Sequence, residues 1–238
     1  MRVSEYFYSI QGEGRNTGMP TFFIRLSGCN LLCGGKGTIK DKKLHDGATW
    51  RCDSIESWIK GEKYTHQELI KKLEQLEPLK RNNIILTGGE PLMQQTEIME
   101  FINAIKEYKC TYEVETNGTI MPDINIVKEI SQWNVSPKLS NSGMPKDRRI
   151  KSEVIEWFQI INADFKFVIS REEDIEEIFL DFIMPFNLNN RRIYLMPAAS
   201  NINELKKNSI LVAELCKQLG CNFSNRLQIQ LWNQTLGV

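Results

Sequence analysis

The segment RLSGCNLLC at residues 25–33, followed by WRCDS at residues 50–54, contains three cysteines, Cys29, Cys33 and Cys52. Thiolates bind iron–sulfur clusters, and three of them can hold three irons of a cubic cluster while the fourth iron stays open. Chemistry occurs at an open metal position, whereas a fully ligated metal is structural or carries electrons. Three such cysteines would therefore allow a reactive iron–sulfur site.

Two other interpretations of these cysteines stay open at this point. They could be buried apolar residues, since free cysteine often behaves as one. They could also be most of a zinc site, for which His45 is the nearby fourth ligand. The C-x3-C spacing is looser than the C-x2-C of typical zinc sites. The cysteines alone do not separate a cluster from zinc.

Size and composition bound the class of protein. The 238 residues suffice for one domain, 1–238, with a sizeable core, and the 30 basic and 30 acidic side chains balance. Because the charges balance, we do not expect a nucleic acid as partner. We do not expect a membrane either, because no apolar run reaches the ~18 residues that span a bilayer. The N-terminus lacks the apolar region of a signal peptide, so a cytoplasmic protein is expected. Its other cysteines, Cys110, Cys216 and Cys221, are expected to be buried structural residues.

Short β-rich runs alternate with segments of helical periodicity along the chain. Repeated β–α units predict an α/β fold in which helices lie outside a parallel sheet. Strands are expected at residues 21–26, 83–87, 112–115, 134–136, 165–169, 192–196 and 227–231. Helices are expected at residues 65–76, 98–105, 122–130, 154–161, 175–178 and 203–219, the first opened by a Thr65–Glu68 capping box.

Polar motifs follow the expected strands. They are TGGEP at residues 87–91, ETNG at 115–118, SPK at 136–138 and MPAAS at 196–200. Ligands of parallel sheets bind at the carboxyl ends of the strands, so these motifs are expected to surround one site. The two glycines of TGGEP would expose backbone to the ammonium and carboxylate of a ligand, although Gly-Gly-x-Pro is also an ordinary turn.

The segment 34–51 differs from the rest of the chain. It is rich in glycine and contains Lys36, Lys40, Lys42 and Lys43. We expect an inserted surface loop, and such a charge run is more typical of a solvated face than of a binding patch.

Together, the cysteines and TGGEP resemble the radical S-adenosylmethionine (SAM) enzymes, whose usual cysteine spacing is C-x3-C-x2-C. Here the first gap matches, but eighteen residues separate Cys33 from Cys52. The family often has an aromatic residue directly before its last cysteine, whereas here Arg51 precedes Cys52 and Trp50 lies one position further back. The CDS sequence at 52–54 still matches the family ending, which favours Cys52 as the third ligand.

Further segments narrow the resemblance to the 7-carboxy-7-deazaguanine synthase family. They are YSIQGEG at residues 8–14, the run 18–30, VSPK at 135–138 and QIQLW at 228–232. The resemblance implies a partial (β/α) barrel that dimerises and converts 6-carboxy-5,6,7,8-tetrahydropterin into 7-carboxy-7-deazaguanine with loss of ammonia. This reaction belongs to queuosine-type 7-deazapurine biosynthesis. The implied cofactors are a [4Fe–4S] cluster, SAM and magnesium, and the cluster and SAM rather than a side chain would generate the radical.

The same resemblance assigns roles to individual residues. Arg25 would bind the substrate carboxylate, because a planar guanidinium can form two bonds with it; the alternative is a surface arginine at a strand edge. Ser54 occupies the position of a magnesium-binding threonine, and magnesium accepts any hard oxygen. The cluster ligands would be Cys29, Cys33 and Cys52; the SAM contacts Arg51, Cys52, Asp53, Gly89, Ser136, Pro137 and Lys138; and the substrate contacts Ile10, Gln11, Gly12, Glu13, Arg25, Thr87 and Val238.

Two other functions are weighed against this one. A radical SAM activating enzyme, which makes a glycyl radical on a partner protein, would share the cysteines and TGGEP but would not need YSIQGEG or Arg25. A non-catalytic zinc or iron–sulfur protein would not bind SAM. A radical SAM enzyme also needs a reductant, such as a flavodoxin, and the lysines of the segment 34–51 would suit an acidic one.

Overall fold

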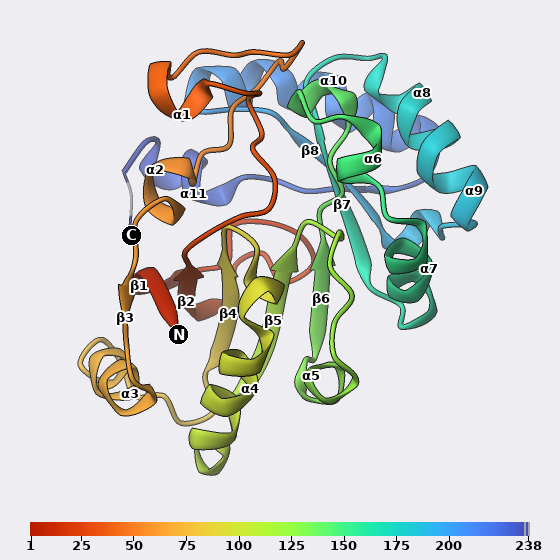
Figure 1. The fold of residues 1–238 in the computed structure, drawn as a ribbon. Coiled ribbons are helices and arrows are strands. Elements are labelled where there is room, and N and C mark those ends of the chain that lie inside the picture. The colour runs from red at the N-terminus through yellow and green to blue at the C-terminus, as the bar shows by residue number, and fades with distance from the viewer. Residues whose placement is uncertain (236, 238) are drawn as a thin grey trace.

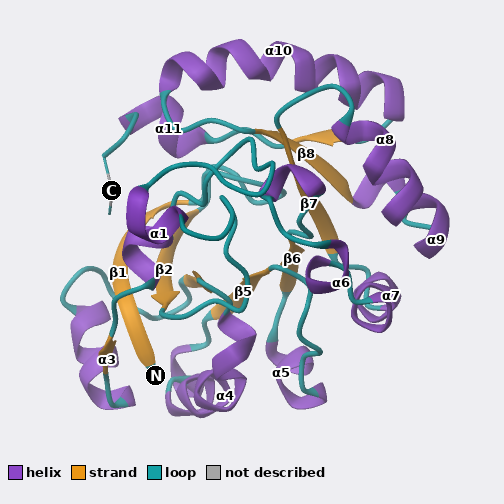
Figure 2. Cartoon of the chain, turned by 45° about the horizontal axis from the view of Figure 1, so that its top comes forward, coloured by secondary structure: helices purple, strands orange, loops and turns teal. Residues whose placement is uncertain are grey.

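One open sheet organises the chain. The computed structural model describes residues 1–235 and 237, and its nine strands have the order β3-β1-β2-β4-β5-β6-β7-β8-β9. Neighbouring strands from β2 to β9 are parallel. Helices lie in an arc outside them (Figures 1 and 2), which confirms the predicted partial barrel. The strands are β1 (Arg2–Ile10), β2 (Pro20–Leu26), β3 (Glu62–Lys63), β4 (Asn83–Gly88), β5 (Thr111–Thr116), β6 (Gln132–Val135), β7 (Asp164–Ile169), β8 (Ile193–Pro197) and β9 (Asn222–Phe223).

Each predicted helix is present, and the Thr65–Glu68 capping box forms as expected. No helix among the described residues has both the length and the apolar character needed to cross a membrane. The helices are α1 (Thr38–Asp41), α2 (Ile55–Trp58), α3 (His66–Glu74), α4 (Gln95–Ala104), α5 (Ile124–Glu129), α6 (Lys146–Arg149), α7 (Ser152–Ile160), α8 (Asp174–Ile178), α9 (Met184–Phe186), α10 (Ile202–Leu219) and α11 (Leu227–Trp232). Short 3-10 turns occur at Pro91–Gln94, Lys106–Tyr108, Ser140–Ser142 and Asn190–Arg192, and a π-helical turn at Phe179–Ile183.

The strands differ from the sequence-based expectation in three that were not predicted, β1 and the two-residue β3 and β9, and in one that is wrong. Strand β1 was not predicted, and it runs antiparallel to both β2 and β3. The expected strand 227–231 is wrong, because these residues form α11. Its LQIQL alternation looks like a strand, but only Ile229 is buried and Leu231 is 52% exposed. A five-residue alternation cannot separate the two structures, and here backbone bonds such as Gln230 N to Arg226 O close a helical turn.

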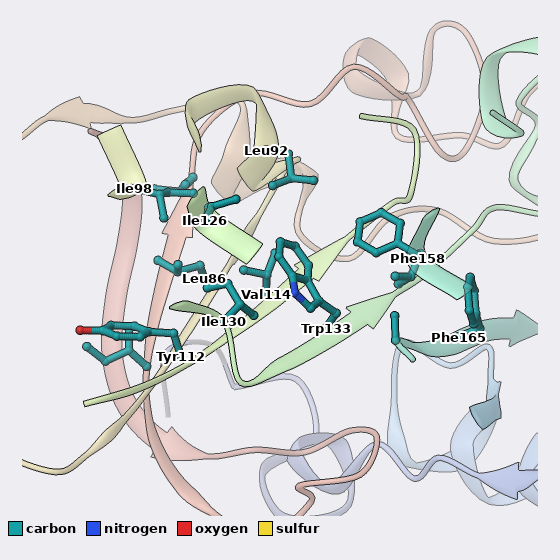
Figure 3. Close-up of a cluster of buried hydrophobic side chains, with 14 of the residues drawn as sticks. Leu86, Leu92, Ile98, Tyr112, Val114, Ile126, Ile130, Trp133, Phe158 and Phe165 are labelled. Atoms are coloured by element: carbon teal, nitrogen blue, oxygen red, sulfur yellow. The ribbon is translucent and has the colours of Figure 1, made fainter. Parts of the chain in front are cut away.

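The core lies between the sheet and the outer helices. Leu86 of β4, Val114 of β5 and Trp133 of β6 pack in it with Ile98 and Ile126 from two helices (Figure 3). All of β4 from Asn83 to Thr87 is buried, as is typical of a parallel strand covered on both faces. The core therefore fixes the strands whose carboxyl ends carry the polar motifs.

Polar side chains occupy the inner side of the barrel. The buried Glu113 of β5 accepts hydrogen bonds from Asn83 (2.9 Å) and Asn134 (3.2 Å) on the neighbouring strands. It also accepts one from Asn16 (2.8 Å), which belongs to the turn between β1 and β2. Next to it, Arg15 forms two bonds with the buried Asp164, at 2.7 and 2.8 Å. These contacts hold the β1–β2 turn against the amino-terminal parts of β4 to β7, on the inner side of the barrel.

The cysteine loop is joined by backbone to the TGGEP turn. Gly89 N donates to Leu26 O (3.0 Å), and Glu90 N donates to Gly28 O (2.9 Å). The Glu90 carboxylate is fully buried and accepts from Leu92 N, Thr116 Oγ1 and Asn117 N, at 3.0, 2.8 and 2.7 Å. Burial raises its pKa, although these donors oppose the shift. The ends of β2, β4 and β5 are thus held together as one unit.

This close contact predicts the effect of a single methyl group. In Gly89→Ala the new Cβ would lie 1.8 Å from Gly28 O, so the turn would have to move away from the cysteine loop. Overpacking of this kind costs about 1–3 kcal/mol. We expect a lower Tm in thermal unfolding and a lower iron content after reconstitution.

The control for this substitution is Gly220→Asn. Gly220 has a left-handed backbone at the end of α10, and no heavy atom of the described residues lies within 4 Å of where its Cβ would stand. Asparagine tolerates that conformation, so this variant should behave as wild type. Wild-type stability and iron content in Gly89→Ala would contradict the account.

Candidate active site

A cavity of about 900 Å³ opens at the carboxyl ends of the strands. This volume is at the upper end for small-molecule sites and leaves room for more than one ligand. Among the predicted site residues that the structure describes, all except Pro137 line this cavity. Val238 lies outside the described residues, so its predicted contact has no structural counterpart here.

The three cysteines lie close to one another on one side of the cavity. Cys52 N donates to Cys33 O at 3.2 Å, so the long segment 34–51 begins and ends at the same place. Burial raises the pKa of Cys29 to about 11 and that of Cys33 to about 12, and the neighbouring cysteines add to both shifts while Lys138 opposes them. Such thiols keep their protons unless a metal replaces them. Three neighbouring sulfurs at one open cavity fit a cluster with one free iron position.

The single-ion alternative fits less well. Within the part of the chain that the structure describes, no three His, Cys, Asp or Glu side chains gather around one point as a lone metal ion requires. His45, the candidate fourth zinc ligand, instead has its Nε2 2.8 Å from Asp41 Oδ2. The described residues therefore give no support to a zinc ion held by the cysteines and His45.

Residues after β5 and β6 complete the cluster side. Asn117 Nδ2 donates to Asn30 Oδ1 (2.8 Å) and lies 4.0 Å from Cys29 Sγ. Lys138 Nζ donates to the carbonyl and hydroxyl oxygens of Ser136, at 2.7 and 2.9 Å. A cation thus stands next to the cysteines, where a negatively charged cluster and a carboxylate ligand need one.

Arg25 stands in the cavity wall rather than on an outer strand edge. It is the register partner of Glu5 across the β1–β2 pair, and its Nε lies 2.5 Å from Glu5 Oε1. Phe7 and Phe23 stack at 4.9 Å between ring centroids, and both line the same wall. A guanidinium held at Nε by a neighbouring carboxylate is oriented for a second, incoming carboxylate.

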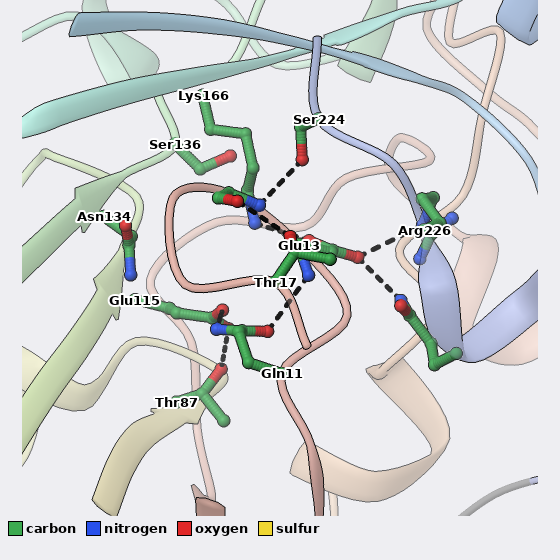
Figure 4. A network of polar contacts seen from close by, with 12 residues as sticks. Gln11, Glu13, Thr17, Thr87, Glu115, Asn134, Ser136, Lys166, Ser224 and Arg226 are labelled. Atoms are coloured by element: carbon green, nitrogen blue, oxygen red, sulfur yellow. Dashed lines mark hydrogen bonds and ion pairs between the residues drawn. The ribbon is translucent and has the colours of Figure 1, made fainter. Parts of the chain in front are cut away.

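Gln11 and Thr87 meet at a common partner that the sequence analysis did not select. Glu115 accepts a hydrogen bond from Gln11 Nε2 (3.3 Å) and another from Thr87 Oγ1 (2.8 Å), as Figure 4 shows. The β1–β2 turn and the ends of β4 and β5 thereby present one continuous polar surface. The ETNG motif was the available signal for Glu115, since this residue begins it.

Glu13 is the centre of a buried ionic network. Its Oε2 lies 2.5 Å from Lys166 Nζ, and its Oε1 accepts from Arg226 Nε (3.2 Å) and Gln228 Nε2 (2.8 Å) (Figure 4). Burial raises the pKa of Glu13, but Lys166 and Arg226 outweigh it and lower the pKa to about 2. Sequence reasoning missed Lys166 and Arg226, because an isolated basic residue in a strand or before a helix belongs to no motif.

The segment 34–51 is partly structured. Gly34 N donates to Ser142 O and Thr49 N to Asn141 O, both at 2.9 Å, and Trp50 Nε1 donates to Asn141 Oδ1 at 2.8 Å. Arg51 donates to Thr38 in α1, at 3.0 Å between Nε and Oγ1. The segment exposes its four lysines, Lys36, Lys40, Lys42 and Lys43, and Lys42 reaches the rim of the cavity.

Comparison with known proteins agrees with this site. A family model described as a 4Fe-4S single cluster domain matches residues 10–151. A 7-carboxy-7-deazaguanine synthase from Pyrobaculum aerophilum is 30% identical over 241 aligned residues, which cover 100% of this chain and 97% of that protein. The chain belongs to the 7-carboxy-7-deazaguanine synthase family. Another member, from Hyperthermus butylicus, is 28% identical and aligns over 96% of this chain and 92% of its own length.

The fold of the chain is also similar to that of a solved structure. The crystal structure of QueE from Escherichia coli superimposes with a TM-score of 0.64 at 22% sequence identity and covers 94% of this chain and 92% of that one. Membership of the 7-carboxy-7-deazaguanine synthase family confirms the predicted radical SAM enzyme and its use of a [4Fe–4S] cluster and SAM. Neither the glycyl-radical activating enzyme nor the non-catalytic zinc or iron–sulfur protein is favoured.

The ion pairs of Glu13 predict a pH effect on stability. Its pKa of about 2 lies below the ordinary 4.5, so its stabilising effect is complete above about pH 4.5 and is lost as the pH falls toward 2. In the apoprotein, Glu13→Gln should lower the free energy of unfolding at pH 7 and flatten its decline between pH 4.5 and 3. Urea unfolding followed by circular dichroism measures both effects.

Glu97→Gln serves as the matched control, because Glu97 is exposed at the start of α4. It should keep the wild-type decline with pH. If Glu13→Gln loses stability with acid as steeply as wild type, the network does not hold Glu13 as assigned.

Proposed function

We propose that this chain converts 6-carboxy-5,6,7,8-tetrahydropterin into 7-carboxy-7-deazaguanine with loss of ammonia, within the cavity at the strand ends. One observation carries the proposal: the residues assigned to the cluster, to SAM and to the pterin share that single cavity. The bound cluster and SAM supply the organic radical that starts the reaction. The chain's own residues hold the reactants and limit their movement.

Arg25 binds the substrate carboxylate in this proposal. Glu5 already orients it through Nε, at 2.5 Å, so the guanidinium loses little freedom when a carboxylate arrives. Ile10, Gln11 and Gly12 offer backbone and amide groups to the donor–acceptor edge of the pterin, and Thr87 offers its hydroxyl. The Glu13 carboxylate is already bonded to Lys166, Arg226 and Gln228, so we assign it to holding this turn beside the pterin.

SAM occupies the cluster side of the cavity. We assign its binding to Gly89, Ser136 and Lys138 together with the segment 51–53. Lys138 Nζ is 2.7 Å from Ser136 O, and it can exchange this bond for one to the carboxylate of SAM. Pro137 does not line the cavity, so the geometry does not support a direct contact between Pro137 and SAM.

Magnesium is the third expected ligand of the site. Ser54 Oγ lies 3.4 Å from Cys52 Sγ at the start of α2 and lines the cavity, which supports its assignment as a magnesium ligand. A homodimer and a cytoplasmic location, both expected from the sequence, stay predictions.

The direct test of the function is product formation. The anaerobically reconstituted protein, given SAM, dithionite and the carboxytetrahydropterin, should yield 7-carboxy-7-deazaguanine, detected by mass spectrometry. Arg25→Lys keeps the charge but loses the planar fork, so turnover should fall about tenfold or more while SAM binding is retained. Arg191→Lys, at an exposed position, is the control. Absence of product from the wild type, or wild-type substrate affinity in Arg25→Lys, would contradict the assignment.

The segment 34–51 is assigned to docking the protein reductant. Its four exposed lysines lie beside the cysteines and attract an acidic surface such as that of a flavodoxin. Because Cys33 O and Cys52 N are already bonded at 3.2 Å, removing residues 34–49 joins points that lie close together. This deletion restores the usual C-x3-C-x2-C spacing, and shortening a loop changes its closure cost only slightly.

The deletion should retain cluster content and dithionite-driven turnover but lose much of the turnover with flavodoxin. In wild type the flavodoxin-driven rate should fall with added salt, and in the deletion variant it should not. Glutamine at all four lysines is the matched variant that leaves the loop in place. Loss of the cluster in the deletion variant would show instead that the loop shapes the site, and a wild-type flavodoxin rate in both variants would exclude docking.

A further inference from the structure

Arg226, at the start of α11, connects three segments of the cavity wall. Its side chain is only 9% exposed. Its Nε donates to Glu13 Oε1 at 3.2 Å, Nη1 donates to the carbonyl of Ala199, and Nη2 to the carboxylate of Asp53. All three nitrogens of this guanidinium are therefore engaged, each with a different segment. Figure 4 shows the contact with Glu13.

The two carboxylates belong to segments of the cavity wall that the proposed function assigns to different ligands. Glu13 lies in the β1–β2 turn, which we assigned to the pterin, whereas Asp53 directly follows the cluster ligand Cys52. Glu13 is 15% exposed and keeps Lys166 and Gln228 as further partners. Asp53 is 60% exposed, and Arg226 is the one ion-pair partner recorded for it among the described residues.

The attachment of Arg226 to the pterin side is firm. Leu227 N donates to Gly12 O at 2.9 Å, and a Cβ on Gly12 would lie 1.9 Å from Gln228 Oε1. The chain around Arg226 is therefore packed directly against the β1–β2 turn. Its contact with the segment that follows Cys52 is a single ion pair, with Asp53.

The pair with Asp53 is not needed to satisfy the fold. Without Arg226, Glu13 would still have Lys166 and Gln228, and the exposed Asp53 could be hydrated. Burying a guanidinium is costly unless its partners compensate for lost hydration. Because the local fold does not require this buried arginine, its role is better explained by the link that it forms between Glu13 and Asp53.

We propose that Arg226 is a positioning residue that couples the β1–β2 turn to the segment after Cys52, so that the pterin and SAM bind cooperatively. The identity of these two ligands rests on the proposed function. A ligand that orders one of these segments also orders the Arg226 network, and the second ligand then meets a wall that is already formed. The coupling is reciprocal, so each ligand raises the affinity for the other by the same factor.

Calorimetric titration of the reconstituted protein measures this factor directly. The affinity for the carboxytetrahydropterin is determined with and without saturating SAM, and the reverse titration checks reciprocity. In wild type each ligand should tighten the other about fivefold or more. In Arg226→Gln and in Asp53→Asn the factor should fall to about one, with iron content kept.

The control variant is Arg192→Gln. Arg192 pairs with Asp164 at 3.1 Å, and it does not line the cavity. It should retain the wild-type coupling factor, so that loss of an arginine–carboxylate pair alone is separated from loss of this particular one. Asp53→Asn leaves the buried Arg226–Glu13 pair in place. If Arg226→Gln is unstable, the coupling factor of Asp53→Asn therefore tests the proposal.

The outcomes separate the two levels of the proposal. Wild-type coupling in both variants would overturn the role of Arg226, as would binding of both ligands to the wild type without coupling. Lower affinity for both ligands at an unchanged coupling factor would show a merely structural role and would also overturn it. Failure of the wild type to bind the pterin at all would overturn the proposed function, and the coupling with it.

Discussion

Two backbone hydrogen bonds determine where the chemistry of this protein can occur. They run from Gly89 N to Leu26 O and from Glu90 N to Gly28 O, and they hold the cysteine loop against the end of β4. The absence of a side chain at Gly89 permits this approach, and the buried Glu90 connects the same unit to β5. The cysteines proposed to bind the cluster and the turn proposed to bind SAM are therefore held together as one unit.

The motifs at strand ends could be predicted because their residues carry both a structural and a chemical signal. TGGEP, ETNG and SPK each lie at the end of a mostly buried strand, and the structure places all three at one cavity. Strand β1 was missed because its RVSEYFYSI sequence mixes polar and aromatic residues and pairs antiparallel at the side of the sheet. The α11 helix was predicted as a strand because apolar and polar residues alternate over its five residues 227–231. That alternation is too short to distinguish a strand from a helix.

The ionic network around Glu13 could not be predicted from the sequence, for a different reason. Lys166 and Arg226 are 153 and 213 residues from Glu13 along the chain, and only the curvature of the sheet brings them together. The eighteen-residue gap between Cys33 and Cys52 posed a similar problem. A spacing pattern cannot show that a long segment returns to its origin, whereas the bond between Cys52 N and Cys33 O shows it directly.

The measurement that tests the central claim most directly is the electron paramagnetic resonance spectrum of the reduced, reconstituted protein with and without SAM. Cys110 supplies the comparison, because its Sγ lies 3.0 Å from Leu79 O at the opposite end of β5. We predict that wild type and Cys110→Ala show a cluster signal that changes on addition of SAM, and that Cys52→Ala loses the signal or the change. A Cys52→Ala protein that keeps both would contradict the account.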